Sequence, residues 1–117
     1  MTSYTSLKAW QHARRLAVEC AKACRTLPRH EQSTLAVAVR RHAYRTATEI
    51  AAAGVTAGAA RLGAVTRAQC SLAATEALLR IAHDLGYLAN RDLAKLEAWC
   101  VETAKTLYGL RKKLTGA

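Results

Sequence analysis

Carboxylates and histidines are the side chains that most often carry enzyme chemistry, and neither type forms a catalytic pattern in this sequence. General acid–base catalysis needs paired carboxylates, or an acid placed beside a base, but the eight acidic residues are scattered singly. The four histidines share no metal-binding spacing, and no HExxH motif, phosphate-binding loop or GxGxxG motif occurs. We therefore expect no enzymatic activity, no small-molecule substrate and no cofactor.

Two of the acidic residues are expected to form structural ion pairs. Glu76 neighbours positions that face inward on a predicted helix, and we expect it to reach Arg40 or Arg41 across the protein. Glu49 is the only charged residue between positions 46 and 60, which favours a structural or interface pair.

The cysteines Cys20, Cys24, Cys70 and Cys100 each lie within an alanine- and leucine-rich helical pattern. Cys20 and Cys24 are one helical turn apart, but the CxxC pairs or nearby histidines of cysteine metal sites are missing. Because no export signal precedes them, we expect reduced thiols in a cytoplasmic protein and no bound metal. No apolar run is long enough to span a membrane.

The remaining chemical signal is positive charge, since 18 lysines and arginines stand against 8 acidic residues, a formal net charge of +10. Residues 1–67 carry 11 basic and 3 acidic groups, and residues 68–117 carry 7 and 5. The charge therefore lies mostly in the first half. Arginines outnumber lysines 12 to 6, which favours bidentate contacts with phosphates.

Four basic residues of the first half, at positions 8, 15, 22 and 29, recur every seven residues and predict a single stripe along a helix. Such a stripe suits a nucleic-acid backbone. Two alternatives remain open: a solvated face that keeps the protein soluble, and a surface for an acidic protein. No aromatic residue is interleaved for base stacking, so we expect weak sequence specificity in any RNA or DNA binding. The candidate nucleic-acid-binding residues are Lys8, Arg14, Arg15, Lys22, Arg25, Arg40, Arg41 and Arg45.

Four helices must position these residues. One proline, six glycines and no phenylalanine nearly exclude a β fold, and apolar residues recur at helical spacing almost throughout. We predict an all-α, antiparallel up-down-up-down four-helix bundle forming one domain over residues 1–117. The predicted helices run from Thr5 or Ser6 to about Leu27, from about 29–31 to the glycines at 54, 58 and 63, from about Ala64 to Leu85, and from Asn90 to about Leu114.

The stripe expected to be buried on the first helix comprises Leu7, Trp10, Ala13, Ala17, Cys20 or Ala21, Cys24 and Leu27. The fourth helix carries an unbroken heptad pattern of Leu93, Leu96, Cys100, Thr103, Leu107, Leu110 and Leu114. A small bundle with 26 alanines buries little apolar area and should gain stability by associating.

The range 46–60 predicts where association occurs, because alanines there occur on every side of the helix. A helix that is apolar all round must be covered on all sides, and one bundle covers only one stripe. We therefore expect a homo-oligomer whose interface includes Ile50, Ala53, Val55, Ala57 and Ala60.

Ordered motifs along nearly the whole chain resemble the bacterial four-helix bundle proteins, also called 23S rRNA intervening-sequence proteins. Leu7-Lys8-Ala9-Trp10-Gln11 with Ala13 is similar to that family's L-x-V-W-Q-x-A opening, and Leu27-Pro28-Arg29-His30-Glu31 to its F-P-x-x-E turn. Further similarities are Arg40-Arg41-His42-Ala43, Ile50-Ala51, Ser71-Leu72 with Glu76, Leu85-Gly86-Tyr87-Leu88, and Leu107-Tyr108-Gly109-Leu110.

The chain departs from the family pattern at several positions. The family's Asn-Ile-Ala-Glu-Gly is Glu49-Ile50-Ala51-Ala52-Ala53 here, so its asparagine, acid and glycine are missing. Arg45 replaces a serine and Cys70 a glycine. Any family activity carried by those positions would be lost or altered in this chain.

The resemblance implies an antiparallel four-helix bundle that assembles as a pentamer, with a poorly defined molecular function. Some members are encoded inside rRNA intervening sequences, and basic barrel-shaped relatives accompany the reverse transcriptases of diversity-generating retroelements. We therefore expect association with nucleic acid or ribonucleoprotein. The alternative is a protein-interaction scaffold for a nucleic-acid enzyme, without direct nucleic-acid contact.

Overall fold

Four long helices make up most of the computed structural model, which describes residues 4–115 and contains no strand within them. The helices are α1 (Lys8–Cys24), α2 (Leu35–Gly54), α3 (Gly58–Asp84) and α4 (Asn90–Thr115), and the short 3-10 helices η1 (Tyr4–Ser6) and η2 (Arg29–Glu31) precede α1 and α2. The predicted all-α class is confirmed.

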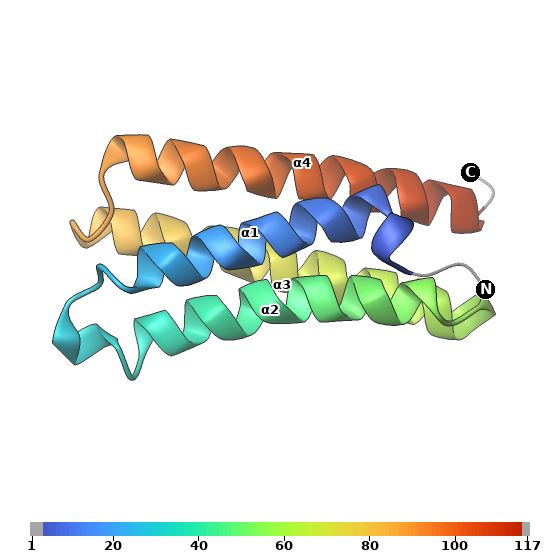
Figure 1. Cartoon of the computed structure of the whole chain (residues 1–117), viewed down its shortest axis with the longest axis horizontal. Coiled ribbons are helices and arrows are strands. Elements are labelled where there is room, and N and C mark those ends of the chain that lie inside the picture. The colour runs from blue at the N-terminus through green and yellow to red at the C-terminus, as the bar shows by residue number, and fades with distance from the viewer. Residues whose placement is uncertain (1–3, 116–117) are drawn as a thin grey trace.

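The four helices lie side by side along the longest dimension of a particle that measures 43 × 23 × 20 Å (Figure 1). The colour gradient runs in opposite directions in successive helices, which is compatible with an up-down-up-down arrangement (Figure 1). Contacts join α1 to α2, α2 to α3, α3 to α4 and α4 back to α1. The helices thus enclose one core, and the outer sides of α1 and α2 form one long face.

Small side chains dominate this core. Nine of its members are alanines, and its largest fully buried side chains are Leu16, Ile50, Leu79 and Leu107. Three fully buried threonines on α2, α3 and α4 each donate their hydroxyl to the carbonyl four residues earlier, at 2.8 Å. This satisfies the hydroxyl within its own helix, so polar residues are tolerated at core positions.

On α1 the buried stripe is rotated relative to the prediction. Leu16 is fully buried although the predicted stripe omitted it, whereas Trp10 and Ala21 are only half-buried. The physical reason is that α1 packs against both α2 and α4, so the stripe's centre lies between them. Trp10 was expected in the core and instead lies at the edge of the α1–α2 contact.

The loop between α1 and α2 contains η2 rather than the first turn of a helix, so the predicted start of the second helix at 29–31 is wrong and α2 begins at Leu35. Gln32 explains the break: its side-chain amide donates to the carbonyls of Cys24 (2.8 Å) and Leu27 (2.9 Å). It thereby adds a hydrogen bond to one carbonyl at the end of α1 and to one just beyond it.

The third helix begins at Gly58, six residues before the predicted start at Ala64. Gly58 has φ +59, a left-handed conformation that glycine adopts without strain, and it allows a short turn after α2. Arg61 Nε then donates to the carbonyl of Ala53 (2.8 Å) in the last turn of α2. A side chain of α3 therefore satisfies a backbone carbonyl at the end of α2.

Gly86 ends α3 as the sequence indicates. Its φ is +83, its N–H donates to the carbonyl of His83 (2.9 Å), and the N–H of Tyr87 donates to that of Ala82 (2.9 Å). This is the Schellman pattern of a glycine-terminated helix. On α4, Leu96, Cys100, Thr103 and Leu107 are buried, which confirms the centre of the heptad pattern.

Within residues 4–115, no helix combines the length and the hydropathy that crossing a bilayer requires.

Candidate nucleic-acid interface

Seven of the eight basic residues predicted to bind nucleic acid are exposed, and only Arg40 is half-buried. Lys8, Arg14, Arg15 and Lys22 lie on α1, Arg25 directly follows it, and Arg40, Arg41 and Arg45 lie on α2. The predicted heptad stripe stops at Lys22, because Arg29 belongs to η2 beyond the end of α1.

Arg15 and Lys22 contact a carboxylate on their own helix. Glu19 is nearly buried, with its side chain 10 % exposed, and it lies 3.3 Å from Arg15 and 3.8 Å from Lys22. Lys95 on α4 approaches the same carboxylate to 3.9 Å. These cations surround Glu19, so Arg15 and Lys22 are only partly available to an external phosphate.

Arg40 faces the end of α1, where it lies beside the thiol of Cys24. Burial raises the pKa of Cys24, and the Arg40 guanidinium offsets part of that increase. The Cys24 Sγ also contacts the Ala36 carbonyl at 3.7 Å. Arg40 therefore contributes to the α1–α2 contact as well as to the positive surface.

Five of the eight candidate residues form no ion pair within residues 4–115 and are exposed to solvent: Lys8, Arg14, Arg25, Arg41 and Arg45. We call them the open cations. Their charge is not neutralised by a neighbouring carboxylate.

Ion pairs engage two arginines of α3, Arg67 and Arg80, whereas Arg91, Lys112 and Lys113 of α4 are exposed and form no ion pair among the described residues. Arg80 joins Glu76 (3.3 Å) to Glu97 (2.7 Å), so the expected pairing of Glu76 with Arg40 or Arg41 is wrong. The reason is proximity: Arg80 lies one turn along the same helix and reaches both carboxylates. Glu49 pairs with Arg67 across the α2–α3 contact, which confirms its structural role.

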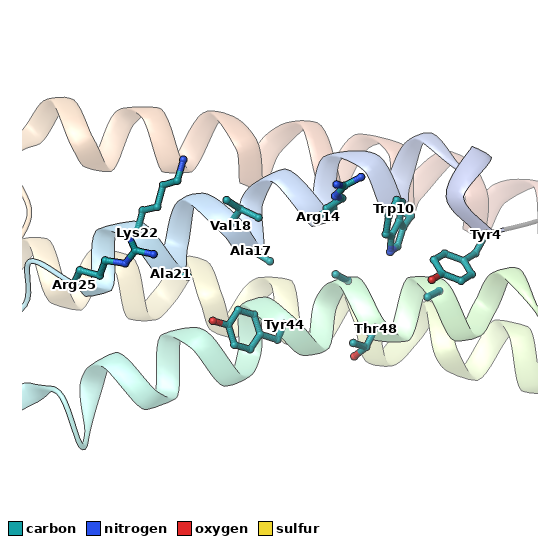
Figure 2. A pocket seen from close by; sticks show the side chains of 12 residues that line it. Tyr4, Trp10, Arg14, Ala17, Val18, Ala21, Lys22, Arg25, Tyr44 and Thr48 are labelled. Carbon is teal, nitrogen blue, oxygen red and sulfur yellow. The ribbon is translucent and has the colours of Figure 1, made fainter.

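A shallow groove of about 540 Å³ runs along the contact between α1 and α2 (Figure 2). We call it the α1–α2 groove. Its lining contains three aromatic and three cationic side chains and no carboxylate. The twelve lining residues are Tyr4, Trp10, Arg14, Ala17, Val18, Ala21, Lys22, Arg25, Tyr44, Ala47, Thr48 and Ala51.

The aromatic residues of the groove correct the expectation that none accompanies the basic residues. Tyr44 of α2 points toward α1, and Trp10 lies farther along the groove beside Tyr4 (Figure 2). The Arg14 guanidinium stacks 5.4 Å from the Trp10 ring centre. Tyr4 and Trp10 precede Lys22 by 18 and 12 residues, and Tyr44 follows it by 22. The packing of η1, α1 and α2 therefore brings the three aromatic residues to one surface.

Two buried cysteine thiols, those of Cys20 and Cys100, are poorly suited to chemistry. Burial raises the pKa of Cys20 far above its ordinary value and that of Cys100 to about 12. A protonated thiol is neither a good nucleophile nor a metal ligand. All four cysteines are free, and the part of the chain from 4 to 115 contains no cluster of three or more side chains suited to a metal.

The five residues predicted for an oligomer interface fall into two groups. Ile50 and Ala53 are buried in the chain's own core, where a second copy cannot reach them. Val55, Ala57 and Ala60 are exposed around the turn from α2 to α3, and the Val55 side chain is 68 % exposed. Any contact between copies at this end therefore uses the turn and the start of α3.

Two departures from the family pattern lie together. Arg45 and Cys70 line a small hollow of about 220 Å³ between α2 and α3, with His42, Thr66, Arg67 and Ser71. The Nδ1 atom of His42 is buried there without a hydrogen-bond partner in the described structure. A third departure, Glu49, binds Arg67 of the same hollow. The substitutions thus change one continuous part of the α2–α3 contact.

Comparison with known families finds one that matches most of the chain. The model of the family described as 23S rRNA-intervening sequence protein matches residues 5–109, which include α1, α2, α3 and most of α4. No curated protein matches the sequence.

Proposed function

Because the chain belongs to the 23S rRNA-intervening sequence protein family, we propose that it is a non-enzymatic, antiparallel up-down-up-down bundle that forms a homo-oligomer and associates with nucleic acid or ribonucleoprotein. The family's description places its members in an RNA-related context. We further propose a cytoplasmic location and a pentameric assembly.

The observation that carries the proposal is the set of open cations. Five exposed positive side chains on or next to α1 and α2 lack carboxylate partners in the described structure, whereas Arg67 and Arg80 of α3 are paired. A phosphate backbone supplies the missing negative charge, and each neutralised phosphate releases counterions. Four of the five are arginines, whose guanidinium binds a phosphate through two hydrogen bonds.

Assembly would strengthen this attraction. A chain of net charge +10 that forms a pentamer carries about +50. Such a particle presents several copies of the open cations to one polyanion, and binding at one copy raises the effective concentration at the others.

The direct test compares two double variants with the same change in net charge. Arg41→Glu with Arg45→Glu alters two open cations on α2, and Lys112→Glu with Lys113→Glu alters two exposed cations at the end of α4. Binding to a structured RNA is measured by gel retardation from about 50 mM to 200 mM salt.

We expect the α2 variant to lose most of its affinity and the α4 variant to retain most of it. The slope of log affinity against log salt should fall by about 1.5 to 2 in the α2 variant, since two phosphate contacts are removed. Equal losses in both variants would contradict a localised interface. No retardation of the wild-type protein at about 50 mM salt would overturn the proposal.

A further inference from the structure

We propose that the α1–α2 groove binds unpaired nucleotides of a single-stranded nucleic acid, with a base against Tyr44 and the backbone along the cations beside the groove. This inference rests on the proposed function and specifies the form of nucleic acid that the surface prefers. Sequence-tolerant binding of single strands combines a positive groove with aromatic side chains on which bases stack. The α1–α2 groove holds both in one lining.

Tyr44 is the aromatic residue that is free to stack. Its side chain is 46 % exposed, and no aromatic or cationic partner covers its ring in the described structure. Trp10 is already occupied, because Arg14 lies 5.4 Å from its ring centre and the Tyr4 ring meets it edge-on at 5.2 Å. An incoming base therefore finds an open ring at Tyr44 and not at Trp10.

The rest of the groove is apolar and small. Its floor includes Ala17, Ala21, Ala47 and Ala51, and Val18 on the opposite helix from Tyr44 is 45 % exposed. Alanine methyl groups leave room above the contact between the helices, and a volume of about 540 Å³ is within the usual range for small-molecule sites. A base removed from water by these side chains gains hydrophobic contact without displacing a larger residue.

The charges that line the groove favour a planar ligand that carries negative charge beside it. Arg14, Lys22 and Arg25 all belong to the lining, and no acidic residue does. In Figure 2, Lys22 and Arg25 lie at one end of the groove and Arg14 nearer the other, with Tyr44 between these ends. A base at Tyr44 therefore has positive charge available for phosphates on both sides of it. In a duplex the same base would be stacked and paired, and Tyr44 could not reach its face.

The experiment compares two oligonucleotides with identical charge. One is oligothymidylate of about 12 nucleotides, and the other has the same length with abasic sites in place of the bases. A paired RNA hairpin is titrated in parallel. The protein variants are Tyr44→Leu and the matched control Tyr108→Leu, which removes an exposed tyrosine of α4 outside the groove. Circular dichroism verifies that both variants retain the wild-type helix content.

We expect the wild-type protein to bind oligothymidylate about 5- to 150-fold more tightly than the abasic strand, in line with the stacking of one base on an aromatic side chain. Tyr44→Leu should remove this preference and leave abasic-strand binding unchanged, and Tyr108→Leu should preserve both affinities. If Tyr44→Leu does not fold, Tyr44→Phe and Tyr44→Gln provide the second comparison at this exposed position: the aromatic variant should keep the preference for oligothymidylate, and the polar variant should lose it.

Two outcomes overturn the inference and leave the proposed function standing. In the first, the protein binds oligothymidylate and the abasic strand with equal affinity. In the second, it binds the hairpin and neither single strand. Displacement of oligothymidylate by poly-glutamate at equal charge would also overturn it, because an acidic polypeptide would then fit the groove equally well. Absence of binding to both strands and to the hairpin would overturn the inference and the proposed function together.

Discussion

Glu31 connects the two loops at one end of the protein. Its carboxylate accepts hydrogen bonds from Thr34 Oγ1 (2.8 Å) and from the Tyr87 hydroxyl (3.2 Å) in the α3–α4 loop. His30 Nε2 lies 3.2 Å from the same hydroxyl. A single acidic side chain thus joins the α1–α2 loop to the α3–α4 loop, a role that its place after a proline turn did not reveal.

The pH dependence of stability should report this contact. The hydrogen bond from Thr34, and then that from Tyr87, hold the pKa of Glu31 below its ordinary value. A lowered folded-state pKa gives stability that is fully present above the ordinary carboxyl pKa of about 4.3 and is lost as pH falls through the lowered value. Thermal unfolding midpoints of the wild type should therefore fall more steeply below about pH 5 than those of Glu31→Gln.

The matched control for that measurement is Glu102→Gln, which alters a half-exposed carboxylate whose ion-pair partner in the described structure is Lys105 on the same helix. Below about pH 5, the thermal unfolding midpoint of Glu102→Gln should fall as steeply as that of the wild type. If the unfolding midpoints of the wild type and of Glu31→Gln fall equally steeply below about pH 5, the role given to Glu31 is contradicted.

At the level of elements, η1 packs onto the end of α2 because that end is a glycine. A β-carbon added at Gly54 would lie 2.6 Å from Cβ of Tyr4 and 3.1 Å from Leu7 Cδ1. The close approach places Tyr4 at one end of the α1–α2 groove. Gly109 on α4 differs, since a β-carbon there would meet nothing within 4 Å.

Alanine at these two glycines should have opposite effects. Gly54→Ala should lower the free energy of unfolding by about 1–3 kcal/mol, because η1 must move away from α2. Gly109→Ala should raise it by about 0.5–1 kcal/mol, because glycine costs this much in the interior of a helix. Urea denaturation monitored by circular dichroism measures both. An unchanged free energy of unfolding in Gly54→Ala would show that η1 is not held against α2 in solution.

For the whole molecule, the question is what covers the apolar side chains that the helices leave outside. Val55 is 68 % exposed at the α2–α3 turn, and Val101 is 47 % exposed on α4. A small alanine-rich core buries limited area per residue, so contact between copies would add stability that one chain lacks.

Light scattering of two aspartate variants tests whether copies associate and through which surface. If copies associate through the α2–α3 turn, Val55→Asp should reduce the particle mass toward that of one 12.6 kDa chain, because a charge would be buried without a partner. Val101→Asp should leave the mass unchanged. Dissociation by Val101→Asp alone would place the contact on α4, and a monomeric wild-type protein at micromolar concentration would contradict association altogether.

Much of the fold was predictable because helix periodicity is a local property. The inward positions of α2 and α3, such as Val39, Ile50, Ala68 and Leu79, follow from spacing alone. Helix ends were less predictable, since Gln32 and Arg61 satisfy carbonyls eight residues earlier through side chains whose direction depends on the folded backbone. The rotation of the buried stripe on α1 depends on two neighbouring helices at once.

Residue types and their order were enough to establish the helical class and the excess of positive charge in the first half, because charge and periodicity are carried by the chain whatever its packing. They also carried the resemblance to the 23S rRNA-intervening sequence family. Tertiary structure alone decided which cations are open. It placed Glu19 among Arg15, Lys22 and Lys95, and it brought Tyr44 to the same groove as Arg14 and Arg25. The physical reason is that ion pairing and stacking depend on distances of a few ångströms between helices, which spacing along one helix does not determine.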